Sequence, residues 1–561
     1  MTEQPIHSGN ELNPPFRVEP GQRASRGLRT LVAVLSLVTA AVPSSVFGQQ
    51  NTDAAAVQTL LKRIEVLEQQ RQASSAPAPV DTNLVGRLLQ RIDELEGKVR
   101  ALESARILPA ITLAPQEGPT LEDLDQKIRV LDRKRELAEE AATARSTNAP
   151  QITVGAEGFA FASADREYLI RLRGLIQGDT RTFFGDHPLA EGNDGFFLRR
   201  ARPILEGTLF GDLDFRFTPE FSSTTTTIYD AYLDYEWRPE LGVRLGRFKG
   251  PVGYENQLPD SAGLFNERSF VSGLVAIRSQ GIQLGGQFAK GLLSYSAGVF
   301  NAVGDGRVAS NDGFGSDLEF AGRLLVEPFK NSSVAALRGL GLGVSGSYSD
   351  ISSNATLLPT TSGGTRPGYV TSALQPFFAY NPVVGPVVAD GQHWRWSPHV
   401  TYLKGPFGIL GEYAVSQQGV LNASTLRSAE LSHQAWQVSA QWVLTGEDAS
   451  FLEIKPRRPF RWSDGGPGAW QLVARFGQFD IDDDAFLGFS DPRTSASSAQ
   501  SWSVGINWWL SRNLRILTSF THTTFDGGGQ VNPLDSSTLG APATVTHQDE
   551  KALLTRVQLA F

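Results

Sequence analysis

The connections between short alternating segments constrain this chain more than any single motif does. From residue 167 to the C-terminus, sixteen segments alternate apolar and polar residues, and the joins between them are long and short almost in turn. A soluble sandwich gives no reason for this order. A transmembrane β-barrel does, because tight turns line its periplasmic rim and long loops line the other. The pattern predicts a 16-stranded antiparallel transmembrane β-barrel over 167–561. We count 417–432 among the long loops, and 446–468 is the one long join where a short turn is expected.

The segments have the two faces that such a barrel needs. In 436–444 and 502–510, bulky apolar residues occupy one parity and polar or small residues the other. A half-buried sheet of a soluble protein would alternate in the same way. The tryptophans favour the membrane, because they lie on the apolar faces near segment ends, as interfacial aromatic girdles do. They are Trp436, Trp442, Trp470, Trp502 and Trp508.

Composition and targeting signals agree with an envelope protein. Beyond the N-terminus there is no apolar run long enough for a transmembrane helix, and the absence of Cys excludes disulfide and thiol chemistry. Residues 1–48 are expected to be a signal peptide, with Arg26 and Arg29 before an apolar core at Leu31–Val42. A retained membrane anchor is the alternative. The alternation that ends in Phe561 is similar to the signal read by the outer-membrane assembly machinery, so we expect the outer membrane as the location.

A helical region separates the signal from the barrel. Within 49–142, apolar residues recur at heptad spacing in three blocks, which predicts a periplasmic coiled coil. A single helix packed on the barrel is the alternative, and the sequence does not decide the number of strands in the coil. Residues 143–166 are expected to be a linker.

The interior of the barrel is where function is expected, since sixteen strands enclose an aqueous channel. Parity turns six arginines and five acids of the first five strands inward. One interpretation is a ladder of guanidinium groups that binds an oxyanion. The other is that the arginines pair with acids on adjacent strands and stiffen the wall. The arginines are 171, 173, 200, 202, 216 and 244, and the acids are 206, 214, 230, 234 and 236. The long third loop, 250–279, is well placed to fold into the lumen and narrow it, and a simple surface loop is the alternative.

Several segments in order resemble the phosphate-selective porin O and P family. They are Phe197-Leu198-Arg199-Arg200-Ala201-Arg202, Phe265-Asn266-Glu267-Arg268-Ser269-Phe270, the stretch 278–284, Leu444-Thr445-Gly446-Glu447 and the stretch 468–475. The resemblance covers roughly residues 150–561. It implies a homotrimer of sixteen-stranded barrels that passes phosphate or related small anions across the outer membrane.

The same resemblance indicates which arginines line the constriction. Arg171 or Arg173, then Arg199 and Arg200, and then Arg268 match the family's segments, and parity adds Arg202. Parity alone would send Arg199 outward. A β-bulge near 199–203 is therefore needed to bring both Arg199 and Arg200 into the lumen.

One departure weakens the expectation of phosphate specificity. Phosphate-specific members cluster lysines at the entrance, where they would steer anions, but this barrel has few lysines and most lie at the periplasmic rim or near the barrel ends. The loop 480–499 instead carries Asp480, Asp482, Asp483 and Asp484, which fit a solvated loop or a divalent-cation site. We expect a weak anion preference.

Other classes of function fit less well. A structural protein that tethers the envelope to peptidoglycan or periplasmic partners through its coiled coil, with an incidental pore, is the main alternative. An outer-membrane lipase is a third class, but the histidines 393, 399, 433, 522 and 547 form no serine–base constellation on one face. We expect no enzyme activity, cofactor, metal site or nucleic-acid partner.

Overall fold

The computed structural model describes residues 125–137, 149–184, 194–223, 226–309, 317–359, 368–463, 465–528 and 548–561. Residues 125–137 form a helix whose exposed surface includes Ile128 and Leu131, both heptad positions. This helix and the barrel belong to different units of the chain, and each is described by itself. The signal peptide and most of the expected helical region lie outside the described residues. No helix among the described residues is both long and apolar enough to span a membrane.

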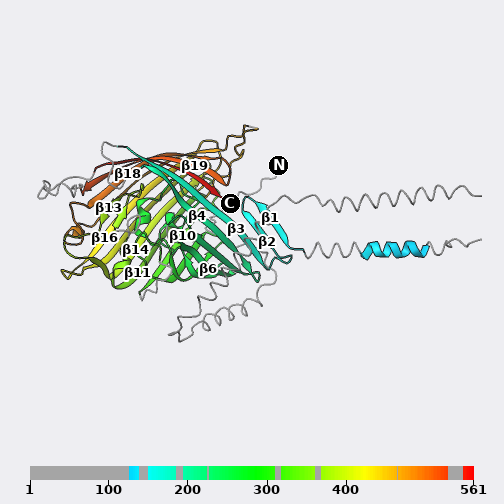
Figure 1. Ribbon diagram of the computed structural model, residues 1–561, viewed down its shortest axis with the longest axis horizontal. Coiled ribbons are helices and arrows are strands. Elements are labelled where there is room, and N and C mark those ends of the chain that lie inside the picture. The colour runs from blue at the N-terminus through cyan, green and yellow to red at the C-terminus, as the bar shows by residue number, and fades with distance from the viewer. Residues whose placement is uncertain are drawn as a thin grey trace, which may run out of the picture. The chain divides into compact units, whose positions relative to one another are not determined.

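A closed antiparallel barrel makes up nearly all of the described chain (Figure 1). In that part of the chain, sixteen strands pair in sequence order, and the last strand, β20, pairs with the first barrel strand, β3. The predicted fold is confirmed. The strands are β3 (Leu169–Phe183), β4 (Gly195–Leu209), β5 (Leu213–Glu220), β6 (Thr227–Arg238), β7 (Leu241–Phe248), β8 (Ser279–Phe288), β9 (Leu293–Asn301), β10 (Leu318–Val326), β11 (Leu340–Asn354), β14 (Val387–Lys404), β15 (Phe407–Asn422), β16 (Arg427–Val443), β17 (Ala469–Asp480), β18 (Ala496–Trp509), β19 (Leu514–Gly527) and β20 (Glu550–Ala560).

The two rims differ in the length of their connections. The rim at which β20 ends, here the C-terminal rim, has mostly tight turns, and the opposite, long-loop rim has the long connections. The join 444–468 is long on the C-terminal rim, as predicted. The prediction of a long loop at 417–432 is wrong, because β15 and β16 pair as far as Asn422 and Arg427 and leave a connection of four residues.

The outer wall explains that difference. In β16 the outward residues from Trp442 to Trp436 are apolar or aromatic, but Gln434, Ser432 and Glu430 continue the same outward parity beyond them. The strand therefore leaves the apolar band and carries on into a polar environment, where its sequence resembles a loop.

Two rows of outward aromatic residues bound the apolar band on this side of the barrel. One row lies at the C-terminal rim and includes the stacked pairs Phe407–Trp442 and Trp470–Trp508, at 5.6 and 4.9 Å between ring centroids. The other lies further up the strands and includes Trp436 against Phe476 and Trp502 against Phe520. The predicted girdle is present, although Trp436 and Trp502 lie within strands and not near their ends.

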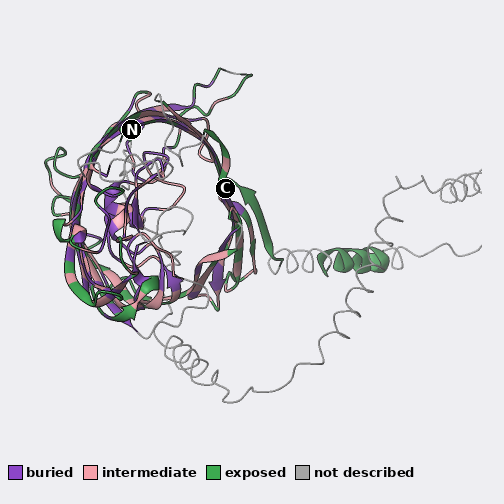
Figure 2. Cartoon of the chain, turned by 60° about the vertical axis from the view of Figure 1, so that its left-hand side comes forward, coloured by how far each residue is buried: buried purple, intermediate pink, exposed green. Residues whose placement is uncertain are grey.

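The stretch 143–166, expected to be a linker, contains two strands in its described part. β1 (Gln151–Gly155) and β2 (Gly158–Ala162) form a hairpin, and β2 pairs with the start of β3. The hairpin extends the wall beyond the C-terminal rim as a flap (Figure 2). Its residues Ile152, Val154, Phe159 and Phe161 are exposed.

Two loops of the long-loop rim pack inside the barrel, and Figure 2 shows chain within the ring of strands. The first, 249–278, contains a helical turn, α5 (Tyr254–Gln257), and a 3-10 turn, η1 (Phe270–Leu274). The second, 355–386, contains a 3-10 turn, η2 (Ala355–Leu357), and a small hairpin of β12 (Gly368–Val370) and β13 (Pro376–Ala379). A further 3-10 turn, η3 (Asp483–Phe486), lies in the loop after β17. The prediction that 250–279 folds into the lumen is confirmed.

Candidate functional site

The loop 249–278 is fastened to the wall by hydrogen bonds that arrive from many strands. Inward side chains of β18, β20 and β3 donate to its backbone carbonyls: Asn507 to Leu264 (2.9 Å), Gln558 to Ser261 (2.9 Å) and Gln177 to Asp260 (3.0 Å). On β19, Arg515 donates to the carbonyl of Ser261 at 2.7 Å. These four strands are neighbours in the ring, and β18 and β19 lie across it from β7 and β8, which the loop joins, so the loop crosses the lumen.

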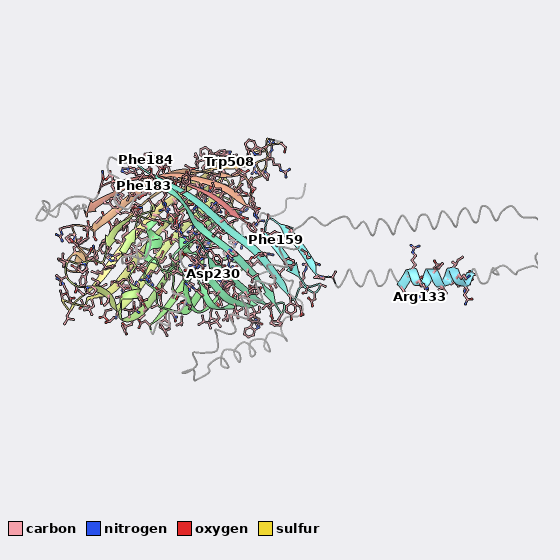
Figure 3. The ribbon with its side chains drawn as sticks, in the orientation of Figure 1. Arg133, Phe159, Phe183, Phe184, Asp230 and Trp508 are labelled. Carbon is pink, nitrogen blue, oxygen red and sulfur yellow. The ribbon has the colours of Figure 1, made fainter. Side chains whose placement is uncertain are left out.

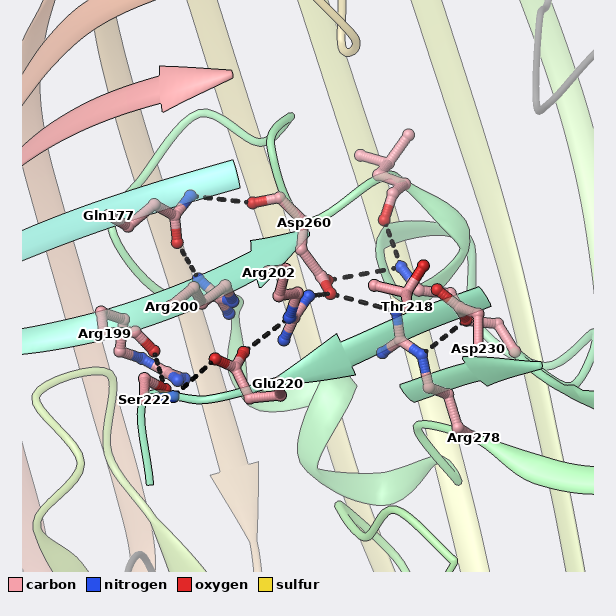
Figure 4. Close-up of polar contacts among 12 residues, drawn as sticks. Gln177, Arg199, Arg200, Arg202, Thr218, Glu220, Ser222, Asp230, Asp260 and Arg278 are labelled. Atoms are coloured by element: carbon pink, nitrogen blue, oxygen red, sulfur yellow. Dashed lines mark hydrogen bonds and ion pairs between the residues drawn. The ribbon is translucent and has the colours of Figure 1, made fainter. Parts of the chain in front are cut away.

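Asp260 is the main charged hub of this loop. Its carboxylate accepts from Arg202 of β4 and pairs with Arg278 at 3.1 Å (Figure 4). It also accepts from Arg268 of the loop itself and pairs with Lys249 at 3.5 Å. Burial alone would raise the pKa of Asp260. The four cations outweigh burial and hold this pKa well below its usual range. Asp260 is therefore a buried anion that gathers cations from the wall and from both ends of the loop.

Glu267 is the second hub. Its carboxylate accepts two hydrogen bonds from Arg199, at 2.6 and 3.0 Å, and one from Arg556 of β20 at 3.0 Å, with Arg181 of β3 at 3.8 Å. Burial opposes ionisation here too, but Arg199 and Arg556 hold the pKa of Glu267 well below its usual range. The loop is thus pinned by one acid to β4 and by the other to β3, β4 and β20.

Arg199 reaches the lumen through a β-bulge. In the pairing of β3 with β4, Gln177 lies opposite Arg200 and Gly178 lies opposite Leu198, so Arg199 is an extra residue. The bulge turns Arg199 and Arg200 to the same side, toward the loop (Figure 4). The bulge predicted near 199–203 is confirmed at the residue where parity fails.

The other arginines singled out by the sequence have separate positions. Arg171 and Arg173 lie near the start of β3 and face Glu206, with nitrogen–oxygen distances of 3.8 and 3.3 Å. Arg216 pairs with Glu206 at 3.2 Å, and Arg244 pairs with Asp234 on the neighbouring strand. Pairing between adjacent strands, the wall-stiffening interpretation, therefore describes this group. Arg199 instead pairs with Glu267, and Arg202 and Arg268 pair with Asp260.

Arg200 differs from its neighbours. It is buried, and its guanidinium donates to Oε1 of Gln177 at 2.5 Å. Among the described residues it has no ion pair, and its Nε has no hydrogen-bond partner. Arg515 is likewise buried and its described partners are carbonyl and amide oxygens, not carboxylates. These two guanidinium groups place positive charge beside the loop without a matching acid.

The hairpin β12–β13 lies against the loop. Phe270 and Leu274 of η1 are buried in one apolar cluster with Phe377, Phe378 and Phe479. Arg475 of β17 joins the two loops, since it donates to the carbonyl of Glu267 and to Oγ of Ser372, each at 3.0 Å. The two loops thus form one packed body inside the barrel.

Sequence reasoning missed the hubs and several of their partners. Asp260, Glu267 and Arg278 lie in or at the end of the predicted lumen loop, but nothing in the sequence pairs them with particular strands. Parity on the last strand was the available signal for Arg556, because outward Val557 places its neighbour Arg556 in the lumen. No group of three or more His, Cys, Asp or Glu among the described residues is arranged to hold a metal.

Comparison with known proteins agrees with this architecture. The family model of the phosphate-selective porins O and P matches residues 170–561. The chain belongs to this family and is an outer-membrane porin, a channel for small solutes. No curated protein matches the chain.

Among solved structures, similarity extends to other outer-membrane barrels. The channel DcaP of Acinetobacter baumannii is 10% identical, with 70% of this chain and 97% of that chain covered and a TM-score of 0.41. The anion-selective porin from Comamonas acidovorans is 12% identical, with 70% and 100% covered and a TM-score of 0.41. The trimer form of OmpT from Vibrio cholerae is 8% identical, with 70% and 99% covered and a TM-score of 0.40.

Proposed function

We propose that this porin passes small hydrophilic anions, phosphate among them, through a constriction formed by the loop 249–278 and the facing arginines. The observation that carries the proposal is an excess of positive charge around the two hubs. In the described chain, the two hubs and the charged groups joined to them by ion pairs or placed beside them comprise eight cations and five carboxylates, although the whole protein has a net charge of −8. The cations are Arg181, Arg199, Arg200, Arg202, Lys249, Arg268, Arg278 and Arg556, and the acids are Asp179, Glu220, Asp230, Asp260 and Glu267.

The physical reason is local and not a matter of net charge. An ion that passes the loop lies within one screening length of the cluster, in a site whose walls exclude much of the water. The paired arginines are largely neutralised, so the positive charge without an ion-pair partner among the described residues lies on Arg200 of β4 and on Arg515 of β19. The position of Arg200 supports it as the residue with the largest effect on selectivity, with Arg171, Arg173, Arg199, Arg202 and Arg268 as further contributors to the anion path.

The test is the reversal potential of single channels in a potassium chloride gradient. We expect a wild-type potential on the anion side and a shift toward cations for Arg200→Gln, with conductance retained. Lys290→Gln, on a short turn of the C-terminal rim, removes the same charge and is expected to have no effect. Equal potentials for all three proteins, or a cation-selective wild type, would overturn the proposal.

Phosphate is tested separately, by titration of inorganic phosphate into chloride-conducting channels. We expect phosphate to lower the chloride current in wild type and to do so less in Arg200→Gln. An anion-selective channel whose chloride current ignores phosphate would keep the anion proposal and remove phosphate from it.

We propose in addition that the barrels assemble as a homotrimer in the outer membrane with the helical region in the periplasm. The family resemblance supports this arrangement. Cross-linking in intact cells and protease protection of residues 53–142 in sealed cells test the two parts, and a monomer or a surface-exposed helix would contradict them.

A further inference from the structure

The long connection on the C-terminal rim begins inside the barrel and ends outside it. Phe451 is buried against Tyr254 and Phe265 of the lumen loop, and Ile454 is buried against inward Val443 and Trp509. The chain then crosses the rim and folds into a tight hairpin. The amide of Phe460 donates to the carbonyl of Leu510 at 2.7 Å, and the amide of Gly468 donates to the carbonyl of Arg458 at 3.0 Å. Arg461 and Gly466 form an antiparallel β-bridge. We call the described residues 455–463 and 465–468 the rim hairpin.

Aromatic rings run from the outer wall onto the rim hairpin. Trp470 and Trp508 stack on the outer face in the aromatic row of the C-terminal rim, Phe460 meets Trp508 edge-on at 5.0 Å, and Trp462 meets Phe460 at 5.1 Å. Figure 3 labels Trp508 beside the loop that stands away from the barrel. Trp462 ends the series and is 93% exposed. The rim hairpin therefore continues the aromatic row of the C-terminal rim outward from the wall.

The same hairpin carries a group of four basic side chains. Lys455, Arg457, Arg458 and Arg461 are exposed, and Asp464 is the one acid in the sequence from Ile454 to Gly468. Lys455 has an exposed partner in Glu453 at 3.4 Å, and Arg458 makes no ion pair with any described residue. A basic group of this density is notable in a protein whose net charge is −8.

We propose that the rim hairpin binds the phosphate headgroups of anionic glycerophospholipids in the leaflet that meets the C-terminal rim. Indole rings favour the membrane–water boundary, where the ring is buried among lipid and the N–H stays wet. Guanidinium groups bind phosphate oxygens in a bidentate manner, and basic residues beside a membrane are attracted to anionic lipid. Lipid is the occupant that fits both features, because the rings continue a row that already faces the bilayer.

The hairpin is held in place before any lipid binds. The indole Nε1 of Trp508 donates to the carbonyl of Pro467 at 2.9 Å, and Arg512 of the next turn donates to Glu453 at 3.0 Å. A preformed loop loses little conformational entropy on binding. The proposal stands apart from the selectivity of the pore, since the rim hairpin lies outside the wall.

The absence of Cys from this chain makes a local probe available. Ser463→Cys, labelled with a neutral fluorophore, reports on the hairpin tip in vesicles of phosphatidylcholine with a rising fraction of phosphatidylglycerol. The readout is protection of the label from acrylamide, an uncharged quencher. We expect protection at a low fraction of the anionic lipid. Arg457→Gln with Arg458→Gln should lower the apparent affinity for anionic lipid about 25-fold, at about fivefold for each cation near an anionic surface, and so move the midpoint to a much higher anionic fraction.

The matched control is Lys290→Gln with Lys404→Gln, which removes two exposed charges from other turns of the same rim and should leave the midpoint unchanged. Channel conductance should be the same in all variants, which shows that each is folded. Protection that does not depend on anionic lipid would overturn the proposal. So would protection by inorganic phosphate in phosphatidylcholine vesicles, which indicates a soluble-anion site, or protection that rises with protein density alone, which indicates a second copy of the chain.

Discussion

At the scale of single residues, each of the two carboxylates of the lumen loop contributes more to holding the loop in place than any one of the arginines that surround them. Asp260 and Glu267 each collect several cations from different strands. Removal of one arginine leaves the others in place. Removal of one acid leaves several buried cations without a partner, which is the more costly change.

The pH dependence of the loop follows from these acids. Because both folded-state pKa values lie well below those of free carboxyl groups, ionisation stabilises the docked loop fully above the unfolded pKa, about 4. This contribution is lost only as the pH falls through the folded-state pKa. We expect single-channel conductance and noise to stay constant from neutral pH down to about 4 and to change below it. Asp260→Asn should show the acid behaviour already at neutral pH, and a wild-type midpoint between about 5 and 7 would contradict the assignment.

Substitutions of Arg268 and Arg475 distinguish the effect of charge on selectivity from the effect of loop packing. Arg268 pairs with Asp260, which keeps three other cations, so Arg268→Ala should move the reversal potential modestly away from anions without loosening the loop. Arg475 joins the loop to the β12–β13 hairpin. Arg475→Ala should move the reversal potential less and should raise the open-channel noise. The reverse order of effects would show that Arg475, and not Arg268, sets the charge of the constriction.

At the scale of elements, the sequence predicted the strands better than the loops. Period-2 alternation turned Arg202 and Arg216 inward, and the failure of parity at Arg199 predicted the bulge. The alternation depends only on neighbouring residues and on which face meets lipid. It failed at Ser428 and Glu430, where β16 has left the apolar band: these outward residues are polar, and inward Ala429 and Leu431 pack in the apolar cluster of the lumen loops. It could not predict the partners of Asp260, which lie on β4 and at both ends of a long loop.

The packing of η1 on the β12–β13 hairpin is expected to hold the loop in place. The ring of Phe270 meets those of Phe377 and Phe479 at 6.0 and 6.1 Å. Phe270→Ala should cost about 3–5 kcal/mol of local stability, visible as faster hydrogen exchange in 249–278 and as larger conductance fluctuations. Phe288→Ala, at an exposed ring on the outer face, is the control and should change neither. Unchanged exchange in Phe270→Ala would mean that the ion pairs alone hold the loop.

At the scale of the whole molecule, the barrel strands close into a ring through pairing with one another alone. All sixteen strands and both lumen loops lie in 169–561 of the described chain. We therefore expect deletion of 53–142 to leave a folded, conducting barrel, checked by heat-modifiable migration and by channel recordings. Altered envelope integrity with unchanged conductance would favour the tethering role of the helical region. Failure of the barrel to assemble would make that region part of the folding unit.

The flap formed by β1 and β2 has a consequence for how the ring is joined. β2 occupies the edge of β3 up to Leu172, and β20 occupies the same edge from Leu175 onward. Between them, Gly174 exchanges backbone hydrogen bonds with Phe561, at 2.8 and 3.0 Å, and a Cβ at Gly174 would meet the Phe561 ring at 2.7 Å. The final strand, β20, thus pairs with the part of the β3 edge that β2 leaves open. A slip of one residue would reverse its faces, and a slip toward β2 would collide with it. The flap therefore acts as a stop that sets the stagger at which the ring closes, and with it the tilt of every strand.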